Sequence, residues 1–169
     1  ESGRDWKKIG PLMRAGAGLV EIVEDLDGRI WVATGAPGGE RSHGNRLWVM
    51  SRDGGDTWSQ PERSSLPDAG TRGSLAVTEG PGRKPFWYYV TVDGPVGQAL
   101  PERNNLTLFG SKDAGKTWLP LRRFHFGNGD SPSVVPIRDG SVGITYKRQT
   151  WNNNGDQVRY VELSDVWGR

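Results

Sequence analysis

Short runs of apolar, β-branched and aromatic residues alternate with polar stretches along the chain. Runs of this length and composition are typical of β-strands, whereas the runs of Ala, Leu, Glu and Lys that favour long helices are missing from the sequence. Asp-Gly pairs beside the runs favour tight hairpin turns, because both central residues of such a turn need a positive φ. We expect strands at residues 18–23, 29–34, 46–51, 74–78, 86–92, 105–111, 133–137, 141–147 and 157–163.

One eight-residue motif recurs between these runs. Residues 51–58 read SRDGGDTW and residues 111–118 read SKDAGKTW, with Trp58 and Trp118 60 residues apart. Residues 1–6 align with the end of the motif, and Trp6 stands 52 residues before Trp58. A turn motif repeated at this spacing, with three to four strands per repeat, favours the blades of a β-propeller over a sandwich.

The residues of the motif predict a structural role. The carboxylates of Asp53 and Asp113 can accept backbone N–H bonds across a turn, and the glycines can adopt a conformation that a side chain forbids. The indoles of Trp58 and Trp118 can pack into the blade. We therefore interpret these aspartates as turn-forming residues rather than general acids, and the tryptophans as core residues.

Composition and charge exclude several functional classes. The 22 basic and 20 acidic residues nearly balance, and no block of like charge suggests a nucleic-acid or membrane-surface partner. There is no cysteine, and the only histidines are His43, expected in a solvated loop, and His125, expected to be packed. We therefore expect no disulfide, metal or cofactor. No apolar stretch is long enough to span a bilayer.

The pattern Ser-x-Asp-x-Gly-x-Thr-Trp resembles the Asp box of sialidases and of BNR-repeat proteins. The resemblance implies an all-β fold in which residues 1–169 form one segment, about three blades of a six-bladed propeller. Three blades leave sheet faces and edges uncovered, so we expect a complement from a larger chain or from another copy. An extracellular or periplasmic location is implied by the same resemblance.

The segment Arg103-Asn104-Asn105-Leu106-Thr107-Leu108, which leads into the second motif, is similar to the sialidase segment Arg-x-Asn-Leu-x-Val. In that family the arginine belongs to a three-arginine cluster that binds the carboxylate of sialic acid, a task that suits a guanidinium fork. The resemblance makes Arg103 the leading substrate-binding candidate, against the alternative of a surface arginine at a strand start. The second cluster arginine would lie near Thr34 or Gly35, where no arginine occurs, and Arg41 is the candidate that follows.

Other sialidase residues find no match. The position of the catalytic glutamate aligns with Ala17 or Gly18, although Glu21 is close by. The stretch aligned with the family's tyrosine nucleophile, residues 129–135, contains no tyrosine. Asp130 would replace that tyrosine poorly, because a carboxylate is repelled by the carboxylate of the substrate, whereas a neutral phenol is not.

The C-terminal stretch resembles a second, BNR-type branch of the superfamily through Ser131-Pro132-Ser133-Val134-Val135, Asp139-Gly140 and Ile144-Thr145-Tyr146. The resemblance allows Tyr146 to reach a ligand at the central face. The alternative is a packed strand residue with a hydrated hydroxyl.

Two functional hypotheses follow. The first is a sialidase-like glycoside hydrolase that acts on acidic sugars, with only part of the active site in this chain and with Arg103, Arg41 and Tyr146 as substrate-binding candidates. The second is a non-catalytic carbohydrate-binding or scaffolding propeller. Both have a carbohydrate as partner, an acidic glycan in the first case, and neither involves nucleic acid or a membrane.

Overall fold

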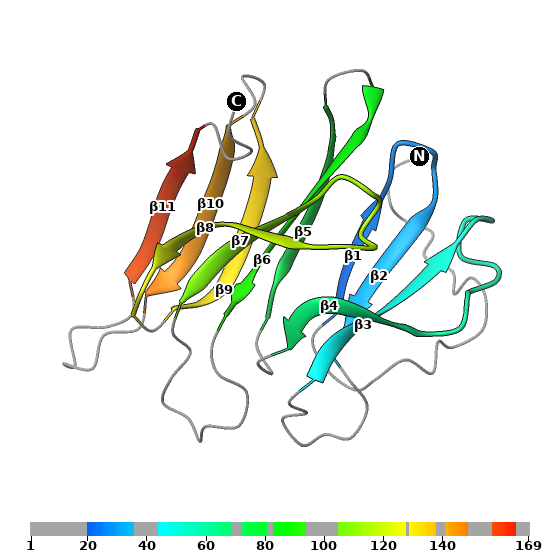
Figure 1. The fold of residues 1–169 in the computed structure, drawn as a ribbon, viewed down its shortest axis with the longest axis horizontal. Coiled ribbons are helices and arrows are strands. Elements are labelled where there is room, and N and C mark those ends of the chain that lie inside the picture. The colour runs from blue at the N-terminus through cyan, green and yellow to red at the C-terminus, as the bar shows by residue number, and fades with distance from the viewer. Residues whose placement is uncertain are drawn as a thin grey trace, which may run out of the picture.

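The computed structural model describes residues 20–35, 44–68, 72–80, 83–93, 105–127, 129–137, 141–148 and 157–164. These residues form eleven strands in three antiparallel sheets (Figure 1). The described ranges contain no α-helix, so the predicted all-β class is confirmed.

Each sheet is a meander in which chain neighbours pair. The first sheet contains β1 (Val20–Glu24), β2 (Ile30–Thr34), β3 (Gly44–Ser51) and β4 (Glu62–Asp68). The second contains β5 (Ser74–Glu79), β6 (Pro85–Val92), β7 (Leu106–Ser111) and β8 (Leu119–His125). The third contains β9 (Gly129–Pro136), β10 (Val142–Arg148) and β11 (Gln157–Leu163).

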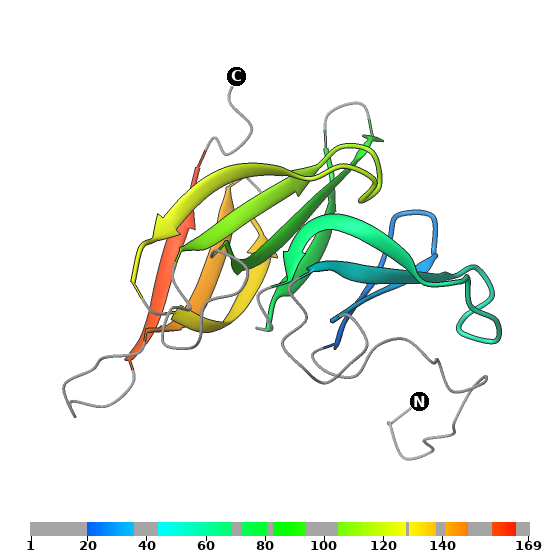
Figure 2. The ribbon, with the colours of Figure 1, turned by 60° about the horizontal axis from the view of Figure 1, so that its bottom comes forward.

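The three sheets stand face to face in chain order, as the two views of the ribbon show (Figures 1 and 2). Their first strands are neighbours, because β1 contacts β5 and β5 contacts β9. Successive four-stranded meanders arranged in this way are the blades of a propeller. The chain therefore forms a propeller fragment, as the motif spacing predicts.

All nine strands expected from the sequence are present, and the structure adds β4 and β8. These are the fourth and outermost strands of their sheets. Their sequences, ERSSLPD and LPLRRFH, are polar and contain Pro67 and Pro120. Proline lacks a backbone donor and is tolerated on edge strands, where one side of the strand needs no partner.

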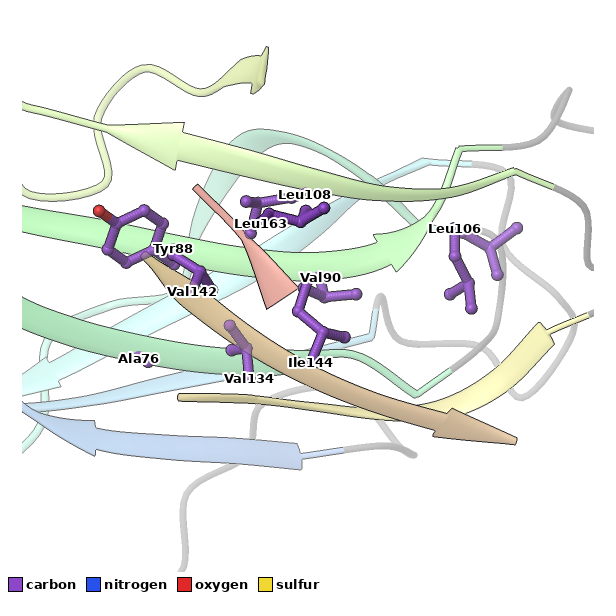
Figure 3. Close-up of a cluster of buried hydrophobic side chains, with 10 residues drawn as sticks. Ala76, Tyr88, Val90, Leu106, Leu108, Val134, Val142, Ile144 and Leu163 are labelled. Carbon is purple, nitrogen blue, oxygen red and sulfur yellow. The ribbon is translucent and has the colours of Figure 1, made fainter. Parts of the chain in front are cut away.

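Aromatic side chains fill the space between the first and second sheets. Trp118 is stacked on Trp48 with ring centroids 5.9 Å apart and an angle of 9° between the planes. Trp87, which is fully buried, meets the ring of Trp48 edge to face at 6.4 Å. The second and third sheets instead enclose a mostly aliphatic cluster (Figure 3): Ala76, Tyr88, Val90, Val92, Leu106, Leu108, Val134, Val142, Ile144 and Leu163.

Both Asp boxes connect the third strand of a sheet to its fourth. In the first, the Thr57 amide donates to Asp53 Oδ1 at 2.9 Å and the Ser51 hydroxyl to the same oxygen at 2.8 Å. The Thr57 hydroxyl donates to Asp53 Oδ2 at 2.5 Å. In the second box, Asp113 Oδ1 accepts from the Thr117 amide at 2.9 Å and from the Ser111 hydroxyl at 2.7 Å. Asp113 Oδ2 accepts from the Thr117 hydroxyl at 2.6 Å. The predicted turn-forming role of both aspartates agrees with these bonds.

The two box tryptophans differ in burial although their turns match. Trp118 is buried against the first sheet and donates from Nε1 to the carbonyl of Gly115 at 2.9 Å. Trp58 is half-buried. The difference follows from position, because Trp118 faces the preceding sheet, whereas no described sheet precedes the first. Trp6 lies outside the described residues.

A third carboxylate organises the hairpin between β1 and β2, where Asp27-Gly28 was expected to form a turn. Asp25 accepts bonds from the Asp27 amide at 2.9 Å, Arg29 Nε at 2.7 Å and Trp31 Nε1 at 2.7 Å. Gly28 has a φ of 77°, whereas Asp27 has no positive φ, so a longer loop held by Asp25 replaces the expected tight Asp-Gly turn. Burial on its own raises the pKa of Asp25, but the bonds from Trp31, Arg29 and Asp27 outweigh it and lower that pKa.

We predict that Asp113→Ala lowers the free energy of unfolding by about 1–3 kcal/mol, because the amide and hydroxyl of Thr117 lose a charged acceptor. Asp53→Ala should lower it as well. Lys116→Ala is the matched control, since Lys116 is an exposed residue in the same turn. Urea denaturation followed by circular dichroism measures the effect. An Asp113→Ala variant as stable as the control would contradict the structural role of the box.

We also predict that the fold loses stability as pH falls from about 4 to about 2. Hydrogen bonds from the side chain and amide of Thr57 and from Ser51 lower the pKa of Asp53 from 3.8 to about 2. A carboxyl with a depressed folded-state pKa contributes stability above its unfolded value, and this contribution is lost as pH falls through the folded value. Melting temperatures across this range should fall less steeply for Asp53→Asn than for the wild type. Equal slopes would refute the prediction.

Candidate functional site

The two edges of the sheets differ in character. The register pairs Val20 with Thr34, Val90 with Ser74 and Gly129 with Arg148. The first strands therefore begin at the edge where the second strands end, the lower edge in Figure 1. We call this edge the loop face. The opposite edge, the turn face, carries the hairpin after β1 and both Asp boxes (Figure 1).

A buried ionic cluster lies near the loop face, between the first and second sheets. Arg46 of β3 is fully buried, with Nη1 3.6 Å from Glu21 Oε2 and its guanidinium carbon 5.2 Å from the centre of the Tyr89 ring. The Tyr89 hydroxyl donates to Glu21 Oε2 at 3.1 Å. The amide of Gly73 donates to Glu21 Oε1 at 2.8 Å. The Glu21 carboxylate of β1 thus contacts groups from both sheets.

Gly73 is required by this packing. A Cβ atom at residue 73 would lie 2.2 Å from the Tyr89 hydroxyl and 2.4 Å from Tyr89 Cζ. The ring is part of the aromatic cluster and cannot move away cheaply. The glycine therefore lets the backbone come within hydrogen-bonding distance of Glu21.

This cluster links two sheets rather than acting on a ligand, and we call Glu21, Arg46 and Tyr89 the clamp. A carboxylate next to a phenol can in principle activate the phenol, but Tyr89 is fully buried and cannot reach a ligand. Glu21 and Arg46 instead join the first sheet to the second beneath the loop face. The sequence analysis noticed Glu21 only for its nearness to an aligned catalytic position and missed Arg46 and Tyr89. An arginine that opens the apolar run Leu47-Trp48-Val49 was the available signal.

A β-bulge marks the start of β9 at the loop face. Thr145 pairs with Ser133 and Lys147 pairs with Asp130, so Ser131 and Pro132 together oppose Tyr146. Ser131 is exposed and has a φ of 49°, which is rare for a residue with a side chain. Its amide donates to Asp130 Oδ1 at 2.7 Å. Bulges of this kind redirect side chains and are frequent beside active sites.

Tyr146 packs beside the bulge. Its ring lies 5.1 Å from the ring of His125 and 5.6 Å from that of Phe124, centroid to centroid, and the side chain is half-buried. These contacts join the third sheet to β8. They agree with a packed strand residue, and its predicted role in ligand binding stays a prediction.

Polar residues from the second sheet complete the described part of the loop face. The Asp93 amide donates to the Asn105 carbonyl at 2.9 Å, which closes the pairing of β6 with β7. Asn105 has a φ of 68°, a conformation that asparagine adopts more readily than most residues. Arg123 Nη2 lies 3.3 Å from Asp93 Oδ2 in a partly exposed ion pair.

Arg103, Arg41 and His43 lie outside the described residues, so only Tyr146 of the substrate-binding candidates has a position in the structure. In the described part of the chain, no group of three His, Cys, Asp or Glu side chains could hold a metal ion. No helix in the same part is long and apolar enough to cross a membrane.

We predict that Glu21→Gln lowers the free energy of unfolding by about 3–5 kcal/mol. The amide keeps one of the two acceptor oxygens but removes the negative charge that lies 3.6 Å from the buried guanidinium of Arg46. The control is Glu79→Gln. Glu79 is also 3.6 Å from an arginine, Arg83, but in an exposed pair, where the loss should stay below about 1 kcal/mol.

Adding Arg46→Met to Glu21→Gln should recover part of the loss, because the buried guanidinium is then removed together with the carboxylate. Chemical denaturation of the four members of this double-mutant cycle measures the coupling. Strictly additive effects of the two substitutions would contradict the clamp.

Solved structures with a similar fold include sialidases and an arabinanase. The leech intramolecular trans-sialidase superposes with a TM-score of 0.65 and 17% identity, over 97% of this chain and 26% of its own. The NanB sialidase from Streptococcus pneumoniae superposes with a TM-score of 0.66 and 18% identity, over 96% of this chain and 26% of its own. The Penicillium chrysogenum α-L-arabinanase complexed with arabinobiose superposes with a TM-score of 0.62 and 15% identity, over 88% of this chain and 46% of its own.

The chain thus spans between about a quarter and a half of the length of these three proteins. Identities this low establish a shared fold only. Among curated protein sequences, none matches the chain. Residues 1–156 match the family described as BNR repeat-like domain. Since this match covers most of the sequence, the chain belongs to the BNR repeat-like domain family, in the sialidase-type propeller superfamily that its motifs predicted.

Proposed function

We propose that this chain contributes part of the sugar-binding face of a sialidase-like glycoside hydrolase that acts on acidic sugars. The observation that carries the proposal is the bulge at Asp130 and Ser131, because it places a strained, exposed residue at the loop-face end of an inner strand, opposite Tyr146. Family membership supports the sugar-directed part of the proposal, and so does the likeness to sialidases and arabinan-degrading enzymes.

Arg103 is the proposed contact for the sugar carboxylate. Strand β7 begins at the loop face with Leu106, three residues after Arg103, which supports a position for the guanidinium near that face. A planar guanidinium donates two parallel hydrogen bonds to a carboxylate, whereas a lysine acts as a point charge. Arg41 precedes β3, which begins at the same face, and is proposed as a second contact.

A non-catalytic, carbohydrate-binding propeller is the second candidate. The observation that favours it is the character of the β9 start, where Asp130 stands in the stretch aligned with the tyrosine nucleophile of sialidases. The Penicillium enzyme of similar fold binds arabinobiose, a neutral sugar. A binding face of this fold therefore need not select acidic sugars. In either case we propose that the chain meets its glycan outside the cytoplasm, in an extracellular or periplasmic setting.

We predict that Arg103→Ala weakens binding of an acidic sugar by about 2–5 kcal/mol, if the ion pair becomes buried in the complex. Arg103→Lys should also weaken binding, because it removes the paired donors and keeps the charge. Isothermal titration calorimetry with a sialoside and an acidic polysaccharide measures both, with a neutral arabino-oligosaccharide as the ligand control. Arg122→Ala, at an exposed arginine of the outer strand β8, is the protein control.

Equal affinity of the wild type and Arg103→Ala for every acidic glycan would refute the role of Arg103. Hydrolysis of a fluorogenic sialoside distinguishes the two candidates: turnover supports the enzyme, whereas binding without turnover supports the non-catalytic propeller.

A further inference from the structure

One side of β10 and β11 changes from apolar to basic toward the loop face. The two strands pair in an unbroken register, so three opposed pairs of side chains share this side: Ile144 with Val161, Tyr146 with Arg159, and Arg148 with Gln157. The first of these pairs packs in the cluster between the second and third sheets, so the side faces the second sheet. The last pair lies at the loop face, where β10 ends (Figure 1).

Arg148 and Arg159 are diagonal neighbours on this side. Gln157 stands opposite Arg148, and Arg159 is two residues further along β11. Residues so placed are about 7–8 Å apart, within reach of one another through long side chains. Both arginines are exposed, and neither has a carboxylate partner among the described residues. Two guanidinium groups this close repel each other, and an anion between them removes the repulsion.

Gln157 holds one of the two guanidinium groups in place. Arg159 Nη2 donates to Gln157 Oε1 at 2.6 Å. The acceptor is a neutral amide, so the bond orients the guanidinium and leaves its charge uncompensated. A guanidinium has five N–H donors in a planar fork that matches a carboxylate or a sulfate. The remaining donors of Arg159 are therefore available to a ligand.

Aromatic rings lie at the same end of the sheets. The ring of Tyr146, opposite Arg159, is half-buried. Phe126, which follows β8, is 71% exposed. It stands three residues before Gly129, the β9 partner of Arg148. An exposed aromatic ring beside basic groups suits an acidic sugar, because the pyranose ring has an apolar face and carries its acidic group at the edge.

The arginine pair stands apart from the proposed carboxylate contact. Arg103 precedes β7, which belongs to the second sheet, whereas the pair lies on β10 and β11 of the third. Both places are at the loop face, because β7 begins there and β10 ends there (Figure 1). An acidic sugar at Arg103 therefore leaves the pair for a further acidic group of the same glycan chain.

We propose that Arg148 and Arg159 form a second anion subsite, which binds the carboxylate or sulfate group of a further sugar in an acidic oligosaccharide. Gln157 orients Arg159 in this subsite, and the ring of Phe126 lies against the apolar face of the sugar. The inference rests on the proposed function, because it extends the acidic glycan beyond the contact at Arg103. It narrows the ligand class to glycans that carry repeated acidic groups.

Isothermal titration calorimetry tests the subsite with free sialic acid, a short oligomer of sialic acid and a heparin oligosaccharide. Arg148→Gln combined with Arg159→Gln should raise the Kd of an oligosaccharide at least about tenfold, because charge-assisted hydrogen bonds are lost. The Kd of free sialic acid should stay unchanged. An effect on the sialic acid oligomer assigns a carboxylate to the subsite, and an effect on heparin assigns a sulfate.

The matched control is Arg52→Gln combined with Arg122→Gln, which removes the same charge from two exposed arginines elsewhere. Equal losses in the two double variants would overturn the subsite, because net charge alone would then explain them. A loss as large for free sialic acid as for the oligomers would also overturn it.

The failure of the subsite can be told apart from the failure of the proposed function. If Arg103→Ala weakens the binding of every acidic sugar while the Arg148 and Arg159 double variant binds like the wild type, only the subsite is refuted. If the wild type binds neither free sialic acid nor the oligosaccharides, the proposed function is refuted together with the subsite. Circular dichroism verifies that each variant is folded.

Discussion

The fold depends on how one sheet packs against the next. Where the first two sheets meet, the rings of Trp48, Trp87 and Trp118 fill the space, and each well-placed ring pair adds about 0.5–1.5 kcal/mol to the effect of burial. Because each sheet covers one face of its neighbour, no sheet completes its own core. Val20 of β1 and Val158 of β11 are exposed and Trp58 is half-buried, because no described sheet covers these faces.

Charged groups support this packing by making bonds that fix the backbone. Asp25, Asp53 and Asp113 each accept several hydrogen bonds within one turn, and their pKa values are lowered accordingly. For Asp113, burial acts in the opposite direction and is outweighed by the bonds from Thr117 and Ser111. Glu21 accepts hydrogen bonds over a longer range, from Gly73 just before β5 and from Tyr89 of β6. Local carboxylate turns shape the first and second sheets, and the buried carboxylate of Glu21 joins these two sheets.

The sequence predicted what depends on local patterns. The inner three strands of each sheet contain β-branched and aromatic runs, and the two Asp boxes share five of their eight residues, so strands, repeat and turn chemistry could all be inferred. Strands β4 and β8 escaped because an edge strand needs no apolar alternation. The partners of Arg46 could not be found either, because Glu21 lies 25 positions before it and Tyr89 lies 43 after it, and only the packing of two sheets brings them together. The bulge at Ser131 depends likewise on the pairing of β9 with β10.

The unequal filling of the two spaces between sheets has an optical consequence. Trp31, Trp48, Trp87 and Trp118 form a chain of indoles with neighbouring centroids 5.4–6.4 Å apart, close enough for their excited states to couple. The space between the second and third sheets contains no described tryptophan in its core. The near-ultraviolet dichroism of these four coupled indoles therefore reports on the junction between the first and second sheets. Separation of the first sheet from the second would remove this exciton contribution.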